Sequence, residues 1–138
     1  MTTKLFDLYS WVAKLAPLSV VSADGRALSC GKPWELRSIN VPVMLHSPRV
    51  MIGHVTALHQ TRDALYAAGV IECYFVAQVR GDNLRPQVDL GGDCVVERQG
   101  EVMLFHAGSV AAVTLGKTPT FDDVWFTIGR GFMSGRVL

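Results

Sequence analysis

The sequence predicts an α+β fold in which a single domain, residues 1–138, forms a curved antiparallel sheet of about five to seven strands. Two observations lead to this prediction. Residues 70–115 are dense in β-branched and aromatic residues and are interrupted by glycine-containing turns, which is typical of an antiparallel meander. An N-terminal, a middle and a C-terminal stretch instead repeat apolar residues at helical spacing, so a helix from each is expected to pack against the sheet.

The N-terminal helix is expected over Thr3–Ala16, with a threonine at its start and Pro17 at its end. Its apolar residues recur at positions i, i+3, i+7 and i+10 of one helical face. They are Leu5, Leu8, Val12 and Leu15. This face is expected to cover part of the core.

Short strands are expected next. Ser19–Ala23 and Arg26–Cys30 flank Asp24-Gly25, a dipeptide that suits a type I′ hairpin turn because both central residues take positive φ. Trp34–Ser38 and Val41–His46 are further strand candidates. A proline in or beside each of them cannot donate to a ladder, so both are expected at a sheet edge.

The middle of the chain is expected to hold a strand and then a helix. The strand runs through Arg49–Gly53, where β-branched residues alternate with others. The helix runs from about Thr56 to Ala68 and ends at Gly69, since glycine is the usual residue just beyond a helix.

The meander is expected to begin with Ile71–Val79, whose residues alternate with a period of two and one apolar face. The strands after it are Arg85–Leu90, Cys94–Arg98, Glu101–His106 and Ser109–Leu115. The hairpin of Cys94–Arg98 and Glu101–His106 carries apolar residues on both faces. Such a sheet must be covered on both sides, so helices are expected on one and more sheet or another subunit on the other.

The C-terminal helix is expected over Thr118–Met133. Thr120, followed three residues later by Asp123, resembles a capping box, with an aspartate in place of the usual glutamate. The apolar residues keep helical spacing. They are Phe121, Val124, Trp125, Ile128 and Phe132.

Composition narrows the possible functions. Charged residues make up 18% of the chain, against roughly 25% in an average soluble domain. The net charge of +1 creates no global field, and Lys and Arg are scattered, so no nucleic-acid partner is expected. No apolar run reaches the length of about 20 residues that a membrane span needs, so no membrane partner is expected either.

The cysteines indicate a compartment. Cys30, Cys73 and Cys94 are odd in number and widely spaced, which favours reduced thiols, a cytoplasmic protein and cysteines that serve as small core residues.

Metal and cofactor chemistry has little support. His54 and His59 are five residues apart, which is not the spacing of a helical zinc pair. The carboxylates of Asp89, Asp93 and Glu97 could gather near a glycine bend, as in metal-dependent nucleases, but the chain lacks the basic surface that DNA requires. We expect no metal and no cofactor.

One segment resembles a known family. Ile52-Gly53-His54-Val55 runs into the expected middle helix, which is similar to the entry of the central helix in hotdog-fold thioesterases and dehydratases. The resemblance implies that Asp63 is the catalytic acid on that helix. The order of helix, hairpin, helix and meander is equally similar to cone-shaped folds of the nuclear-transport-factor-2 type, whose sheets curl around an apolar pocket.

The sequence is interpreted as a non-catalytic binding module for an apolar small molecule or a protein partner, acting as a homodimer. Aromatic side chains are the candidate contacts, because a chain with few charges leaves apolar surface to cover. Trp125 and Phe126 would lie about 100° apart around a helix, so that one faces the core and the other an interface. The candidate contact residues are Tyr9, Trp11, Trp125 and Phe126.

Two alternatives remain open. The first is an enzyme acting on small hydrophobic or acyl-thioester substrates, with His54 and Asp63 as an acid–base pair. It requires these two side chains to converge in a cleft, with the pKa of at least one of them displaced. The second is an inhibitor or immunity-type protein that blocks a macromolecular partner, and it requires a large exposed patch and no cavity.

Overall fold

The fold is mostly β-sheet in the computed structural model, which describes residues 8–132 and side chains as far as residue 129. The expectation of an α+β fold packed by three helices is therefore wrong. The described residues form an 8-stranded sheet, a 3-stranded sheet and one short α-helix. The strands are β1 Leu8–Pro17, β2 Arg26–Leu28, β3 Glu35–Leu36, β4 Val41–Leu45, β5 Val50–Gln60, β6 Ala64–Glu72, β7 Arg85–Leu90, β8 Val95–Gln99, β9 Val102–Ala107, β10 Ser109–Gly116 and β11 Trp125–Phe132.

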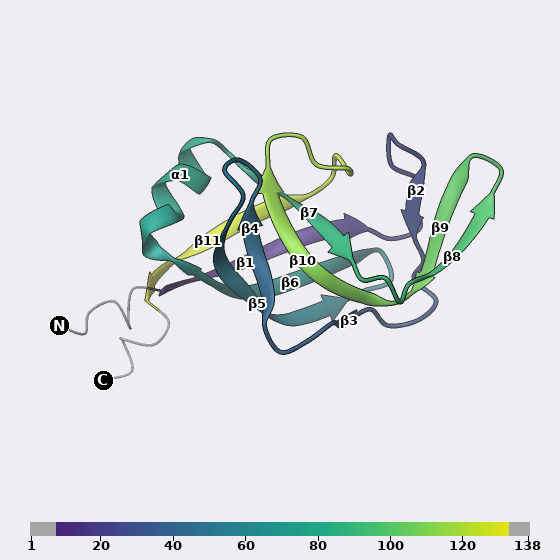
Figure 1. Ribbon diagram of the computed structural model, residues 1–138, viewed down its shortest axis with the longest axis horizontal. Helices are drawn as coiled ribbons and strands as arrows, with labels where there is room; N and C mark the ends of the chain where they lie inside the picture. The colour runs from purple at the N-terminus through teal and green to yellow at the C-terminus, as the bar shows by residue number, and fades with distance from the viewer. Residues whose placement is uncertain (1–7, 133–138) are drawn as a thin grey trace.

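The large sheet curls back on itself (Figure 1). Its order is β11-β1-β6-β5-β4-β10-β3, and β7 pairs with the other edge of β10. β7 also lies against β1 and β11, at the far end of that order. The pairing of β10 with β3 and β4 is parallel, so the sheet is mixed and the expected antiparallel meander is not formed.

The concave side of the sheet holds the core. Trp11 is 1% exposed, and its ring stacks on Phe126 with the ring centroids 4.8 Å apart. The Trp11 indole Nε1 donates to the Val70 carbonyl oxygen (3.0 Å), which satisfies the one polar group of that side chain. Aliphatic residues from every second strand position fill the rest, as expected where one sheet face is buried.

A short helical segment lies at one end of the large sheet (Figure 1). It consists of a 3-10 turn, η2 Cys73–Phe75, and the helix α1 Val76–Gly81. Val76, Val79 and Leu84 are buried and join the core cluster. The expected strand Ile71–Val79 is thus wrong beyond Glu72, where the chain turns helical.

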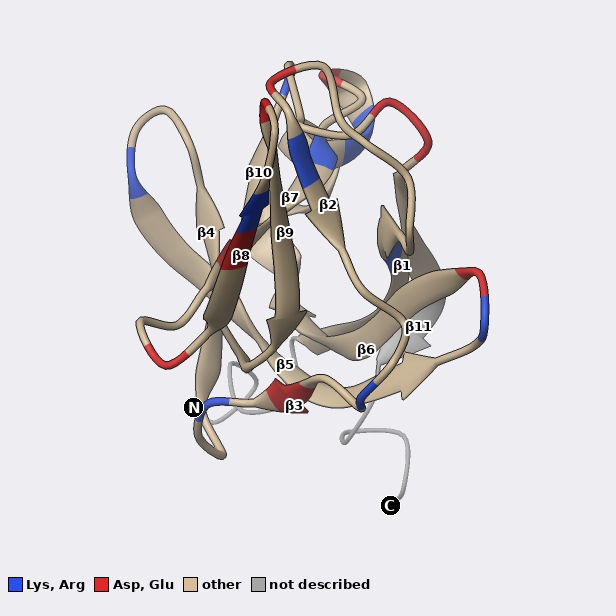
Figure 2. Ribbon diagram, turned by 90° about the vertical axis from the view of Figure 1, so that its right-hand side faces the viewer, with Lys and Arg blue, Asp and Glu red and all other residues tan. Residues whose placement is uncertain are grey.

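The small sheet, β2-β9-β8, projects from the opposite end (Figures 1 and 2). Its β8–β9 hairpin confirms the predicted one, with Gln99 paired to Val102 across the turn. His106 Nε2 lies 2.6 Å from Glu97 Oε1 on this hairpin, and that hydrogen bond lowers the pKa of Glu97. The other predicted hairpin is wrong in its first half, because only Arg26–Leu28 is a strand and it pairs in parallel with β9.

The expected helices are strands for a common physical reason. Within Thr3–Ala16 the described residues form β1, and Trp11, Ala13 and Leu15 are buried at a period of two, which the helical spacing of other apolar residues masks. Thr118–Met133 contains a loop and then β11. Its aromatic and β-branched residues suit a strand better than a helix.

The expected helix Thr56–Ala68 is the hairpin of β5 and β6. Thr61 makes the turn, since its Oγ1 accepts from the backbone N–H groups of Asp63 (3.2 Å) and Ala64 (3.1 Å). The sequence order on which the hotdog and cone-fold resemblances rest is therefore not present. None of the helices within residues 8–132 is both long and apolar enough to cross a membrane.

The β5–β6 pairing depends on a glycine. A Cβ on Gly69 would lie 2.0 Å from the His54 carbonyl oxygen and 2.7 Å from Trp11 Cζ2. We expect Gly69→Ala to lower the free energy of unfolding by about 1–3 kcal/mol, because backbone and core must both shift. Urea denaturation measures this change. Gly81→Ala is the control, since nothing lies within 4 Å of that added Cβ, and equal stabilities of the two variants would contradict the prediction.

Candidate functional site

Three neighbouring strands present a polar row on the outer face of the large sheet. In β4, β7 and β10 the residues Val43, Val88 and Val113 face the core and are buried. Strand register places Thr114 beside Gln87 on β7 and beside Met44 on β4. Directly opposed residues share a face. Residues one position away from the core valines therefore lie together on the outside.

Thr114 and Asp89 form the centre of this row. The Thr114 Oγ1 donates a hydrogen bond to Asp89 Oδ2 (2.6 Å) from β10 to β7. Thr114 is only 8% exposed although it faces outward, because β4 and β7 flank β10 on both sides. The contact is a hydroxyl bonded to a carboxylate, the stronger, charge-assisted kind of hydrogen bond.

His46 lies at the edge of the same row. It directly follows β4, and its backbone N–H donates to the Leu115 carbonyl oxygen (2.9 Å). Gly116 is its neighbour on β10, where an added Cβ would come within 3.4 Å of the His46 Cβ. Gly116 has no side chain to fill the space beside His46 on this face of the sheet.

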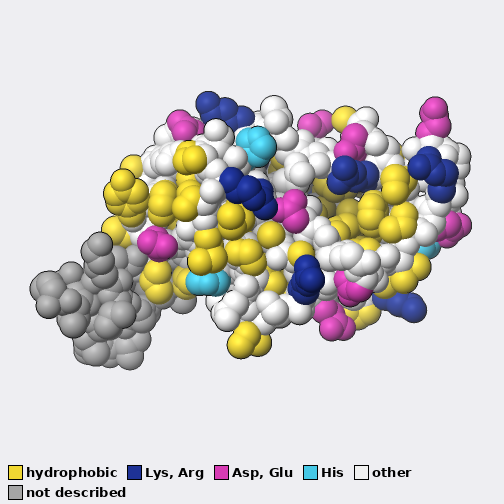
Figure 3. Space-filling view, viewed as in Figure 1, with side chains coloured by type: hydrophobic (Ala, Val, Ile, Leu, Met, Phe, Trp, Pro, Cys, Tyr) yellow, Lys and Arg dark blue, Asp and Glu magenta, His cyan; other side chains and the backbone are white. Residues whose placement is uncertain are grey.

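These residues line a pocket of about 280 Å³. Figure 3 shows basic, acidic and histidine side chains close together over β10 and β7, with apolar side chains around them. Arg85 stands on β7, and its Nη1 donates to the Asp122 carbonyl oxygen (3.2 Å). The lining residues are His46, Arg49, Arg85, Gln87, Asp89, Thr114, Gly116, Lys117, Thr118 and Pro119.

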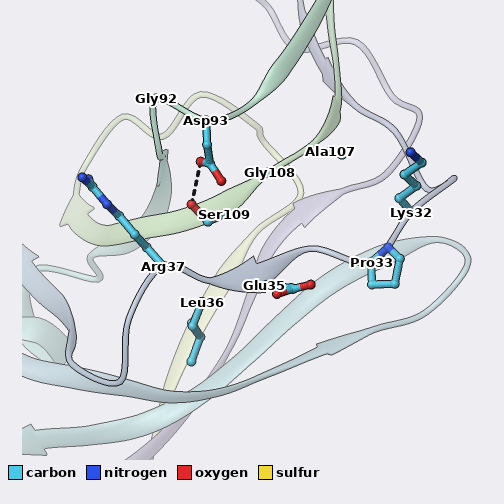
Figure 4. A pocket seen from close by; sticks show the side chains of 10 residues that line it. All are labelled: Lys32, Pro33, Glu35, Leu36, Arg37, Gly92, Asp93, Ala107, Gly108 and Ser109. Atoms are coloured by element: carbon cyan, nitrogen blue, oxygen red, sulfur yellow. Dashed lines mark hydrogen bonds between the residues drawn. The ribbon is translucent and has the colours of Figure 1, made fainter.

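A second, larger hollow of about 820 Å³ lies beside β3 and the start of β10 (Figure 4). It also contains a hydroxyl–carboxylate pair, since Ser109 Oγ donates to Asp93 Oδ1 (2.8 Å). No histidine lines it, and its charged residues are of mixed sign, with Lys32 and Arg37 beside Glu35. The pocket at Thr114 is therefore the better candidate for chemistry.

Thiol chemistry is not favoured near the second hollow. Burial raises the pKa of the Cys94 thiol, the Asp93 charge adds to that effect, and a backbone hydrogen bond involving Ser109 opposes it. A thiol with a raised pKa is mostly protonated at neutral pH and is a poor nucleophile.

The structure does not bring together His54 and Asp63, the predicted acid–base pair. His54 lies within β5 and lines a different hollow of about 460 Å³, with Glu72, Cys73 and Tyr74 among its neighbours. Asp63 lies in the turn after β5, which ends at Gln60. The strand length from His54 to Gln60 alone corresponds to about 20 Å.

The four predicted contact residues all lie on β1 and β11. Trp11 is in the core, and Tyr9 and Phe126 are half-buried against it. Trp125 is 41% exposed on the outer face, where its ring lies 6.2 Å from that of Tyr66. None of the four lines the hollows described above.

The three carboxylates that could have gathered near the glycine bend do not form a cluster either. Asp89 and Asp93 bond hydroxyls in different pockets, and Glu97 lies on the β8–β9 hairpin beside His106. Within residues 8–132, no group of three or more His, Cys, Asp or Glu side chains is arranged to hold a metal ion.

Sequence reasoning missed His46, Asp89 and Thr114 as a group. Each lies in a strand that was predicted, and the prediction for Arg85–Leu90 matches β7 residue for residue. The sequence signal in that strand is its alternation. It places Arg85, Gln87 and Asp89 on one face of the strand and the buried residues on the other. The sequence alone does not show that β10 pairs with β4 and β7.

No known protein family, curated protein or solved structure matches this chain significantly.

The Thr114–Asp89 bond has a measurable effect on stability. We expect Thr114→Val to lower the free energy of unfolding by about 1–3 kcal/mol, because it leaves a half-buried carboxylate without its donor. Thr114→Ser keeps the hydroxyl and should stay close to the wild type. Urea unfolding of the three proteins checks this, and a valine variant as stable as the wild type would show that the bond contributes nothing.

Proposed function

We propose that the protein is a hydrolase that cleaves an acyl bond, such as an ester, thioester or amide, with Thr114 as its nucleophile. The observation that carries this proposal is the hydrogen bond from Thr114 Oγ1 to Asp89 Oδ2 (2.6 Å) in a pocket that His46 also lines. A hydroxyl within hydrogen-bond reach of a base is the arrangement that nucleophilic catalysis requires.

The geometry supports a specific division of roles. Asp89 accepts the Thr114 proton as the hydroxyl oxygen bonds to the acyl carbon, since it is the group already bonded to that hydroxyl. His46 acts as the general acid and gives a proton to the leaving group as the acyl bond breaks. Water then attacks the acyl-threonine and loses a proton to His46, and Asp89 returns its proton to Thr114. The products are the free acid and the leaving group with its proton.

The proposal keeps one alternative from the sequence and moves its site. The sequence analysis placed the acid–base pair at His54 and Asp63, which lie apart on the β5–β6 hairpin. His46 and Asp89 instead line one pocket, and this shared lining is the support for placing the pair there.

A covalent probe tests the nucleophile. Incubation with a fluorophosphonate should add the phosphonyl mass to the peptide that contains Thr114 in the wild type and in Thr114→Ser, and not in Thr114→Val. His46 is exposed, so the His46→Ala variant should fold normally. The variant should nevertheless hydrolyse 4-nitrophenyl acetate about 10²-fold or more slowly, because it lacks the proton donor.

Ser109→Ala is the matched control. Ser109 lies on the same strand, is buried, and donates to Asp93 as Thr114 donates to Asp89. The variant should keep both labelling and hydrolysis. Labelling that persists in Thr114→Val, or that disappears in Ser109→Ala, would reject Thr114 as the nucleophile.

A second candidate function is binding to another copy of the chain, as the sequence suggested. The observation that favours it is the uncovered outer face of β11 and β1, where Trp125 is 41% and Val12 is 49% exposed. Lys14, beside them on this face, is paired with Asp123. Two copies can therefore meet there without bringing unpaired like charges together.

Light scattering tests the self-association. The wild type should show twice the chain mass of 15.1 kDa, and Trp125→Lys should show the single mass, because a buried lysine opposes association. Tyr74→Ser, at an 84% exposed aromatic residue on η2, is the control that should remain dimeric. A wild type of single mass would end this candidate.

We also propose that the protein is cytoplasmic. The support for this location is the state of the three cysteines, all of which are free thiols. Cys30 and Cys73 are exposed rather than in the core as expected, and exposed free thiols persist in a reducing compartment.

A further inference from the structure

We propose that the acyl substrate carries an anionic group, a carboxylate or a phosphate, which binds Arg49, Arg85 and Lys117 beside Thr114. This inference rests on the proposed hydrolase function, because only that function makes the bound molecule a substrate. The binding of an anion to the pocket stands on its own observations, which concern charge rather than the nucleophile.

The basic side chains come from three different segments and converge on one small space. Arg49 belongs to the turn between β4 and β5, Arg85 begins β7, and Lys117 follows β10. All three line the same pocket of about 280 Å³ as Thr114. Because these cations come from separate segments, a charged face on a single strand does not account for their grouping.

These cations have no acidic partners of their own. In the part of the chain that the structure describes, none of the three forms an ion pair with a carboxylate. Asp89 is the one acid that lines the pocket, and the Thr114 hydroxyl is bonded to it. The lining therefore carries an excess of two positive charges before His46 is counted, in a chain whose total is only +1.

Such a grouping of cations favours a counter-charge. Arg49 and Lys117 are exposed and Arg85 is half-buried, so their mutual repulsion is partly screened by water and salt. Most basic residues are scattered over the chain, so a group of three around one pocket is a departure from the general pattern. An anion in the pocket relieves the repulsion, and guanidinium groups bind carboxylate and phosphate oxygens in pairs.

The position of the anion follows from the strands. Arg85 lies beside Gly116, and Gln87 lies beside Thr114, on adjacent strands. The backbone position of Arg85 is thus about two residues along the strand from the nucleophile, or about 7 Å. That distance corresponds to a short acyl chain between the anionic group and the acyl carbon, so a compact dicarboxylate monoester has the required length.

Matched esters test the substrate class. We expect kcat/KM for mono-4-nitrophenyl glutarate to exceed that for neutral 4-nitrophenyl pentanoate at least 10-fold at low salt. The ratio should fall toward one in 0.5 M NaCl, because salt screens exposed cations. It should also fall toward one in the Arg49→Gln/Lys117→Gln double variant. Arg85 is kept because it also bonds the Asp122 carbonyl.

Arg62→Gln is the charge-matched control. Arg62 lies in the turn between β5 and β6, is exposed, and lines none of the hollows described here. Its removal changes the net charge without touching the pocket, so it should keep the ratio of the two esters. A ratio near one in the wild type, or an equal loss in Arg62→Gln, would overturn the proposal.

Direct binding separates this inference from the hydrolase. Titration of the full chain with glutarate and, separately, with inorganic phosphate is followed by calorimetry, in the wild type and in the Arg49→Gln/Lys117→Gln double variant. Binding that the double variant loses supports the anion site even where no ester is hydrolysed, in which case only the hydrolase fails. Tighter binding of glutarate identifies the group as a carboxylate, and tighter binding of phosphate identifies it as a phosphate. Hydrolysis without binding of either anion overturns the anion site and leaves the hydrolase standing.

Discussion

The position of β10 between β4 and β7 is the constraint on which both the fold and the candidate site depend. Its parallel pairing with β4 joins segments about seventy residues apart in the chain, and its antiparallel pairing with β7 continues the sheet toward β1 and β11. On the inner side this pairing places Val113 and Leu115 in the core. On the outer side the same register places Thr114 between two strands, where it lines the pocket and is bonded to Asp89. The packing that stabilises the sheet thus also positions the hydroxyl.

The strands that build the site were predictable, and their arrangement was not. Val41–His46, Arg85–Leu90 and Ser109–Leu115 were expected as strands, and β4, β7 and β10 occupy almost the same residues. Their pairing is nonlocal, and local propensity carries no information about which strand neighbours which. His46 could be assigned to a strand end, but its position beside Gly116 depends on a partner far along the sequence.

The errors in the predicted helices have a different origin. The stretch around Trp11 satisfies both a helical and an alternating pattern, because apolar residues occupy most of its positions. Burial decides between them, since Trp11, Ala13 and Leu15 point inward together. Within Thr56–Ala68, Thr61 favours a hairpin over a helix, because its hydroxyl bonds the backbone of the turn. A chain so rich in apolar residues leaves periodicity ambiguous, and the tertiary sheet determines the result.

Strand β10 carries two buried hydroxyls, and comparing them shows what makes one of them a candidate for chemistry. Ser109 and Thr114 each donate to an aspartate on a neighbouring segment, so the hydrogen bond alone does not distinguish them. The surroundings do. Ser109 faces a wide hollow with acids and bases in balance, whereas Thr114 shares a small one with an imidazole and an excess of cations. A bond that served only to join two strands would need neither. The imidazole and the excess of cations are therefore what distinguish the two hydroxyls, and they are the reason that Thr114 rather than Ser109 is the proposed nucleophile.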